Sequence, residues 1–203
     1  MLKASNLSHS YDYLLFDKLN LHFKASTSTA ILGSSGCGKS TLLHILSTML
    51  KPDSGEVFYN GKSIYNLSDD ERLKIRRYDF GIIFQQHYLF KGFSAYENIE
   101  LASILSKNTI DSEILEKLGI DKLVKNKATK LSGGEQQRVS IARVLCKKPK
   151  VIFADEATGN LDFANANNVI NILNDYVKAN NALFIFVTHD EKLASLCDSQ
   201  IRL

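Results

Sequence analysis

The residues with the clearest chemical meaning form a glycine-rich segment at positions 33 to 41. It reads Gly-Ser-Ser-Gly-Cys-Gly-Lys-Ser-Thr, which matches the phosphate-loop pattern G-x-x-x-x-G-K-[ST]. Backbone N–H groups of such a loop converge on phosphate oxygens, and the helix that follows adds partial positive charge. We expect Lys39 to reach the β- and γ-phosphates and the Ser40 hydroxyl to bind Mg²⁺. The predicted contacts to the nucleotide are Gly33, Ser34, Ser35, Gly36, Cys37, Gly38, Lys39, Ser40 and Thr41.

Two carboxylates, Asp155 and Glu156, directly follow the apolar segment 151–154, which has the character of a buried strand. Asp155 is suited to hold the shell of a magnesium ion, commonly through water. Glu156 is suited to accept a proton from an attacking water or to orient that water. Alone, the pair could equally be two solvated acidic residues at a strand end. Beside a phosphate loop, we predict that both belong to the same site.

A second glycine pair occurs in the segment Leu-Ser-Gly-Gly-Glu-Gln-Gln-Arg at positions 131 to 138. Ser132 and Glu135 have the spacing of a helix capping box. That explanation does not account for two adjacent glycines, which weaken a helix start with no obvious packing benefit. We therefore predict that Ser132, Gly133, Gly134 and Glu135 form a second phosphate-contacting surface. Two such surfaces in one chain indicate a nucleotide gripped from two sides, by two copies of the chain.

The hydrophobic pattern predicts which elements position these residues. Strands are expected before the phosphate loop and before each carboxylate or histidine of interest, with helices between them. The region after Gln85 is mostly helical, and Ser94 with Glu97 forms another capping box. The expected strands are short ones within 2–24, then 29–32, 56–59, 80–84, 151–154 and 182–187, and the expected helices include 39–49 and 163–179. This order indicates an α/β nucleotide-binding core with a helical lobe inserted between Gln85 and Pro149.

Composition restricts the function classes further. The chain has 203 residues, 44% of them hydrophobic, and its net charge of +3 is too balanced to indicate nucleic-acid binding. Three widely separated cysteines show no metal-binding spacing, which is typical of a reduced cytosolic protein. No apolar stretch has the length of a membrane span, and the N-terminus does not resemble a signal peptide. We therefore expect a cytoplasmic protein that is not itself a channel.

Taken in order, these segments resemble the ATP-binding cassette (ABC) ATPases across essentially the whole chain. The resemblance implies a single domain, 1–203, with a P-loop NTPase (RecA-like) core and an N-terminal antiparallel β subdomain. The core would comprise about 1–90 and 149–203, and the helical subdomain about 91–148. In that family the glycine pair belongs to the signature sequence, which closes over ATP held by the other subunit.

The resemblance assigns roles to further residues. Tyr11 is similar to the aromatic residue that stacks on adenine, although a surface tyrosine in a turn is an equal alternative. Gln85 resembles the glutamine that contacts Mg²⁺ or water, with Gln86 as the neighbouring alternative. His189 resembles the histidine that contacts the γ-phosphate, and Asp162 lies in a loop that crosses the dimer interface. The implied catalytic set is Lys39, Gln85, Glu156 and His189, and the implied magnesium set is Ser40, Gln85 and Asp155.

The segment Thr-Gly-Asn-Leu-Asp at 158–162 is similar to the subgroup of lipoprotein-releasing, macrolide-exporting and cell-division ATPases. Ala157 stands where that subgroup usually has proline, which leaves the backbone freer at that point. The change does not alter any predicted catalytic group.

The implied function is that of an ATP-hydrolysing subunit with ATP and Mg²⁺ as its ligands. Two copies would form a homodimer around two ATP and drive integral membrane permease subunits, for export or lipoprotein extrusion. The protein would be peripheral on the inner face of the membrane, without a nucleic-acid partner. Aromatic residues at 87–93 could receive a permease helix or pack inside the helical lobe. Alternatives are a mechanical regulator that transports nothing, a soluble ABC protein acting on ribosomes or DNA, and an inactive ATP-binding module.

Overall fold

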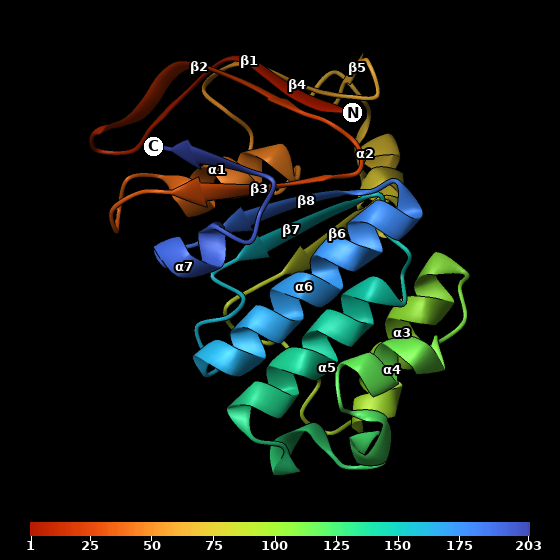
Figure 1. Cartoon of the computed structure of the whole chain (residues 1–203). Helices are drawn as coiled ribbons and strands as arrows, with labels where there is room; N and C mark the ends of the chain where they lie inside the picture. Colours follow the sequence, from red (N-terminus) through yellow and green to blue (C-terminus); the bar gives the residue numbers. More distant parts are fainter.

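The computed structural model describes all residues, 1–203, and contains two β-sheets and a group of helices. In Figure 1 the antiparallel sheet lies on top, the parallel sheet in the middle, and the long helices α5 and α6 beneath. The antiparallel sheet has the order β2-β1-β4-β5 and the parallel sheet the order β6-β7-β8-β3-β9. The strands are β1 Leu2–Ser10, β2 Leu14–Phe23, β3 Thr27–Leu32, β4 Ser54–Tyr59, β5 Lys62–Ser63, β6 Phe80–Ile83, β7 Val151–Asp155, β8 Leu183–Val187 and β9 Ser199–Arg202.

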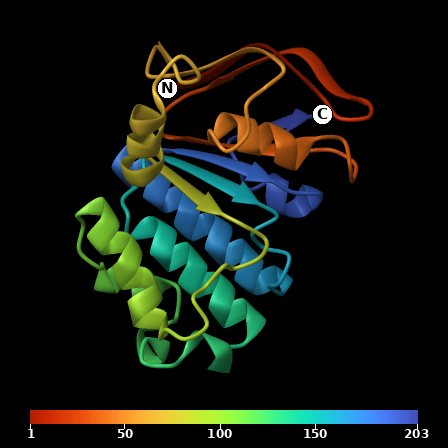
Figure 2. The ribbon, with the colours of Figure 1, turned by 180° about the vertical axis from the view of Figure 1, so that it is seen from behind.

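The helices lie on both faces of the parallel sheet. Three of them, together with two short 3₁₀ helices, occupy the stretch between β6 and β7, where the helical lobe was predicted. Figure 2, seen from behind, shows this lobe beneath the sheet beside α6. The helices are α1 Lys39–Leu46, α2 Asp69–Tyr78, α3 Ala95–Ser106, α4 Ser112–Lys117, η1 Asp121–Leu123, η2 Ala128–Lys130, α5 Gly133–Leu145, α6 Phe163–Asn180 and α7 Glu191–Ala194. None of them is both long and apolar enough to cross a lipid bilayer.

The parallel sheet is buried on both faces, as its continuous apolar strands require. In β8, Leu183 and Ile185 face the cluster formed with α1 and the antiparallel sheet. Phe184 and Phe186 face the opposite cluster, which is formed with α5 and α6. Because side chains alternate between the two faces of a strand, β8 contributes to both hydrophobic clusters, one on each face of the parallel sheet.

The register of the sheet brings the predicted site residues to one edge. Val187 at the end of β8 pairs with Ile31 of β3 on one side and with Asp155 of β7 on the other. The carboxyl ends of these strands are therefore level, and ligands of α/β sheets bind at such ends. The phosphate loop, the carboxylates and His189 all leave the sheet at this edge.

The structure confirms the predicted α/β architecture and the main predicted elements, with end points that differ by a few residues. Four elements outside the helical region were not predicted: α2, α7, the two-residue strand β5 and the edge strand β9. Helix α2 has no buried residue, so it lacks the apolar stripe that reveals a helix in a sequence. Its capping box, formed by Ser68 and Glu71, was the available signal.

Gly55 lies near the start of β4, beside β1 in the antiparallel sheet, and it offers a sharp test of the fold. Its φ is +85°, and a Cβ there would lie 2.2 Å from the backbone oxygen of Asn6 in β1. Gly61 also has a left-handed φ of +82°, but nothing lies within 4 Å of its Cβ position. We expect Gly61→Ala to cost about 1 kcal/mol of unfolding free energy, and Gly55→Ala about 3 kcal/mol because the clash adds to the backbone strain. Urea unfolding measures both free-energy losses. Equal losses would show that the backbone of β1 moves away from the added Cβ at no energetic cost.

Candidate functional site

The phosphate loop forms because β3 delivers the chain to the edge of the sheet and α1 starts from it. The residue before α1, Gly38, has φ +98°, a conformation that a side chain would strain. Lys39 is almost fully buried. Its ammonium group donates to the carbonyl oxygens of Gly33 at 2.8 Å and Ser34 at 2.7 Å. The loop thus holds the lysine cation at its centre, where phosphate oxygens can replace the carbonyls.

Ser40 and Asp155 come together from α1 and β7. The Ser40 hydroxyl donates to Oδ1 of Asp155 at 2.8 Å. Mg²⁺ in proteins uses few protein ligands, commonly a carboxylate together with substrate phosphates and water. The donor set of a hydroxyl and a carboxylate beside a phosphate loop therefore fits Mg²⁺. The sequence predicted these two residues as partners although 115 positions separate them.

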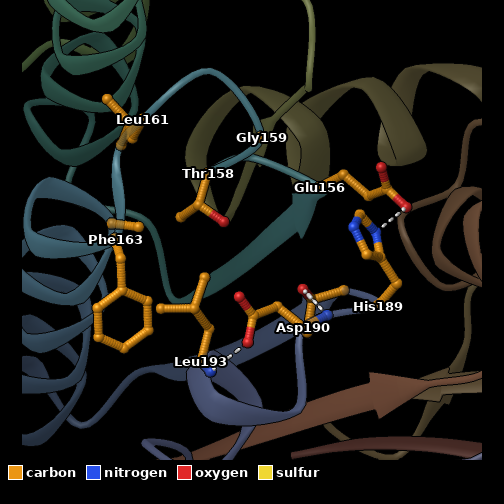
Figure 3. A pocket seen from close by; sticks show the side chains of 10 residues that line it. Glu156, Thr158, Gly159, Leu161, Phe163, His189, Asp190 and Leu193 are labelled. Atoms are coloured by element: carbon orange, nitrogen blue, oxygen red, sulfur yellow. Dashed lines mark hydrogen bonds and ion pairs between the residues drawn. The ribbon is translucent and has the colours of Figure 1, made fainter.

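Glu156 takes an unusual backbone conformation, with φ +44° in the left-handed region. Its N–H donates to the carbonyl of Val187 at 3.0 Å, which fixes it against the end of β8. Its carboxylate lies 3.2 Å from Nδ1 of His189, as the dashed line in Figure 3 shows. Strained residues in a well-supported frame are typical of functional sites. The two groups predicted to act on the γ-phosphate region are therefore in contact.

Two hollows meet at Glu156. The first, of about 270 Å³, we call the nucleotide groove; it extends from the phosphate loop to the tip of the β1–β2 hairpin. The second, of about 220 Å³, is shown in Figure 3 and lies between the segment after β7 and the start of α7. The nucleotide groove is lined by Tyr11, Tyr13, Leu15, Ser35, Gly36, Gly38, Lys39, Ser40, Thr41 and Glu156.

Tyr11 lines the nucleotide groove with an exposed ring, as a residue that stacks on a base must. The ring of His9 packs edge-on against it, with centroids 5.1 Å apart. Sequence reasoning missed Tyr13, whose hydroxyl donates to the carbonyl of Gly36 at 3.2 Å. The available signal was its alternation with Tyr11 in the same turn.

Gln85 follows β6 and lies exposed, and its backbone carbonyl accepts a hydrogen bond from Nδ2 of Asn160 at 3.0 Å. It lines a groove together with Asp155, as does Gln86. Gln86 also lines a neighbouring groove with His87 and Leu89. Gln85 and Asp155 therefore lie along one groove, and the role of Gln85 toward a metal stays a prediction.

The aromatic segment after Gln85 is divided between the two predicted roles. Tyr88, Phe90 and Phe93 are exposed. Leu89 instead packs against the hydrophobic cluster of the helical lobe. His87 is half-buried and bonds to the side chain of Gln137 on α5.

The signature segment begins α5 as a complete capping box. Ser132 donates its N–H and hydroxyl to the Glu135 carboxylate and accepts the Glu135 N–H. These bonds hold the pKa of Glu135 below its ordinary value. One expectation needs correction: Gly134 does have a packing reason, because a Cβ there would lie 3.2 Å from Leu161. For Gly133 nothing lies within 4 Å, so no such reason exists.

The signature segment contributes to neither hollow beside Glu156. In both ribbon views the start of α5 lies in the helical lobe, well below α1. Asp162 caps α6 instead: its carboxylate accepts from the N–H of Asn165 at 2.9 Å and from its side-chain amide at 2.7 Å. These bonds lower the pKa of Asp162. The residues predicted to act across a dimer interface are therefore separate from the nucleotide groove of their own copy.

A glycine loop between strand β3 and helix α1, facing a carboxylate at the end of β7, which lies on the other side of β8, defines a P-loop nucleoside triphosphatase. The family model described as ABC transporter matches residues 16–159. The chain is an ATP-binding, ATP-hydrolysing cassette and belongs to the ABC transporter family.

Curated relatives and solved structures agree with this assignment. The lipoprotein-releasing system ATP-binding protein LolD of Psychrobacter arcticus is 38% identical, over 100% of this chain and 95% of the relative. The protein of the same name from Shewanella frigidimarina is 41% identical, over 86% of this chain and 75% of the relative. A dimeric, post-hydrolysis structure of the ATP-binding cassette MJ0796 with ADP and Pi has a TM-score of 0.89 and 33% identity, covering 100% and 94% of the two chains. CbiO1 from Clostridium perfringens, part of the transporter complex cbiONQ, has a TM-score of 0.86 and 30% identity, covering 99% and 83%.

Proposed function

We propose that two copies of this chain close around two ATP molecules, each held between the phosphate loop of one copy and the signature segment of the other. The observation that carries this proposal is that the signature segment at the start of α5 is separate from the nucleotide groove of its own copy. The start of α5 lines neither hollow beside Glu156, although Ser132 and Gly133 are exposed there. A two-fold dimer would bring the second helix start to the first. The relative MJ0796, which has a dimeric structure with ADP and Pi, supports this arrangement.

The residues of the nucleotide groove have distinct proposed roles. Tyr11 stacks on adenine, and Lys39 exchanges its two carbonyl partners for the β- and γ-phosphate oxygens. Ser40, Asp155 and Gln85 hold Mg²⁺, which neutralises charge on the phosphates when it is bound. The rate comes from positioning and charge neutralisation, because phosphoryl transfer to water needs no covalent intermediate on the protein.

Glu156 and His189 act at the γ-phosphate in this proposal. Glu156 orients the attacking water and accepts its proton as the water oxygen bonds to the γ-phosphorus and the bond to the β-phosphate oxygen breaks. His189 contacts the γ-phosphate oxygens in this proposal, and its 3.2 Å contact with Glu156 supports that role. Loss of the γ-phosphate removes the bridge between the two copies, so the dimer opens. ATP thus acts as the ligand that binds the closed state better.

We further propose that opening and closing drive a permease of the lipoprotein-releasing kind, with the chain peripheral on the cytoplasmic face of the membrane. The relatives from Psychrobacter and Shewanella carry that name at 38% and 41% identity. The exposed rings of Tyr88, Phe90 and Phe93 follow Gln85 directly, so a permease helix seated there would sense the nucleotide site. No nucleic acid is needed for this activity.

Reconstitution tests this proposal. The chain is placed in vesicles with a permease of the lipoprotein-releasing kind, together with a labelled lipoprotein and a soluble acceptor. We expect MgATP to release the lipoprotein and the Lys39→Ala variant to release none. ATP hydrolysis without release would favour a mechanical regulator that transports nothing. Co-purification with ribosomes or DNA in place of a membrane protein would favour the soluble alternative.

A further inference from the structure

His44 lies one helical turn after Ser40 on α1, so both side chains face the same way. They meet the two oxygens of one carboxylate. Ser40 donates to Oδ1 of Asp155 at 2.8 Å, and Nε2 of His44 lies 3.9 Å from Oδ2. The sequence pattern Ser-x-x-x-His in a helix thus places two donors around Asp155.

The imidazole of His44 has an unmet hydrogen-bonding capacity. Its Nε2 is buried and has no hydrogen-bond partner. A buried polar atom without a partner carries a free-energy cost, which marks it as a group with a further role. Oδ2 of Asp155 lies 3.9 Å from this atom, and a shift of about 1 Å gives a normal hydrogen bond.

The second neighbour of His44 is the segment that leads to Gln85. The His44 and Phe84 rings lie 6.4 Å apart between centroids. His44, Gln85 and Asp155 line one groove. His44 therefore lies between the carboxylate of the proposed magnesium pair and the strand end that carries the glutamine.

We propose that His44 is a positioning residue for the magnesium site: its Nε2–H donates to Oδ2 of Asp155 and fixes the rotation of the carboxylate. With Ser40 on Oδ1 and His44 on Oδ2, the orientation of the carboxylate would be fixed while lone pairs remain available to a metal ion or its bound water. Hydrogen bonds to ligating groups typically change metal affinity by about 10- to 100-fold when they are removed. The inference rests on the proposed function, because it requires Ser40 and Asp155 to hold the metal.

The test is a magnesium titration of nucleotide binding by the full chain. A fluorescent ATP analogue is bound first in EDTA and then at increasing MgCl₂. The main variant is His44→Phe, which keeps the ring beside Phe84 but has no donor; His44→Leu replaces it if it does not fold. His44→Gln restores a donor, and His22→Leu is the control because His22 is exposed on β2.

We expect His44→Phe to need roughly 10-fold more Mg²⁺ for half-saturation, with metal-free affinity within about twofold of the wild type. His44→Gln should recover part of the difference, and His22→Leu should match the wild type. An unchanged magnesium titration in a folded His44→Phe or His44→Leu chain would overturn the proposal, as would an equal loss of metal-free binding. If the wild-type chain shows no magnesium-dependent binding, the proposed metal site fails instead.

Discussion

Replacing Glu156 with glutamine will leave ATP bound but stop its hydrolysis, and an ATP-bound dimer will accumulate. Glutamine can still orient water by hydrogen bonding, but it cannot accept the proton, and a positioned general base contributes about 10²- to 10⁴-fold to a rate. Glutamine also has the size and backbone preferences of glutamate. The left-handed backbone at this position, with φ +44°, is therefore preserved. Because the γ-phosphate remains in place, the contact that holds the two copies together persists.

Three measurements check this expectation: phosphate release, ATP affinity, and dimer formation by size-exclusion chromatography with light scattering. Glu116→Gln is a matched control, because Glu116 is exposed on α4 and away from the sheet edge. It should hydrolyse ATP at the wild-type rate and form no lasting dimer. Steady-state hydrolysis by Glu156→Gln at the wild-type rate would remove Glu156 from its proposed role.

The site could be predicted from the sequence where local chemistry and chain order both carry information. The phosphate loop has its own pattern, and the carboxylates follow a strand that must be buried, so Ser40 and Asp155 could be paired across 115 positions. The reason for a glycine at position 134 was harder to predict. Its packing against Leu161 depends on a tertiary contact, which the sequence does not reveal.

Other features could not be predicted, for physical reasons that differ between residues. Helix α2 buries no side chain completely, and only its Ile75 packs partly against a hydrophobic cluster, so its sequence shows little apolar periodicity. The bond of Tyr13 to the phosphate loop depends on how the hairpin tip folds over it. In the sequence, nothing distinguishes His44 from other helix residues. Only the folded chain shows that β7 places Asp155 beside it. The roles of Tyr13 and His44 depend on partners that are distant in the sequence, and single-sequence reasoning cannot identify those partners.

Two inactive variants will restore activity to each other when they are mixed. Lys39→Ala removes the cation from the phosphate loop and should abolish tight ATP binding. Gly133→Asp puts a negative charge where the signature helix should meet a phosphate. It should fold normally, because nothing lies within 4 Å of the Cβ position and an acidic residue suits a helix start. Each variant alone therefore forms dimers in which both shared sites lack one half.

In a mixed dimer, one site combines the intact phosphate loop of the Gly133→Asp copy with the intact signature of the Lys39→Ala copy. The other site carries both defects. If equal amounts mix freely, half of the dimers are mixed and each has one working site of two, so about a quarter of the wild-type ATPase rate should return. Gly133→Ala, which adds no charge, should stay close to wild type as the control for Gly133→Asp.

Full activity of Gly133→Asp alone would show that one copy binds the nucleotide without its partner. A mixture as inactive as its components would mean that the two halves of a site do not come from different copies, or that one intact site cannot act alone. A covalently linked dimer of one wild-type copy and one copy that carries both substitutions separates these two cases. It keeps about half of the wild-type ATPase rate if each copy holds a complete site, and it has no activity if the sites are shared, because both sites then lack one half.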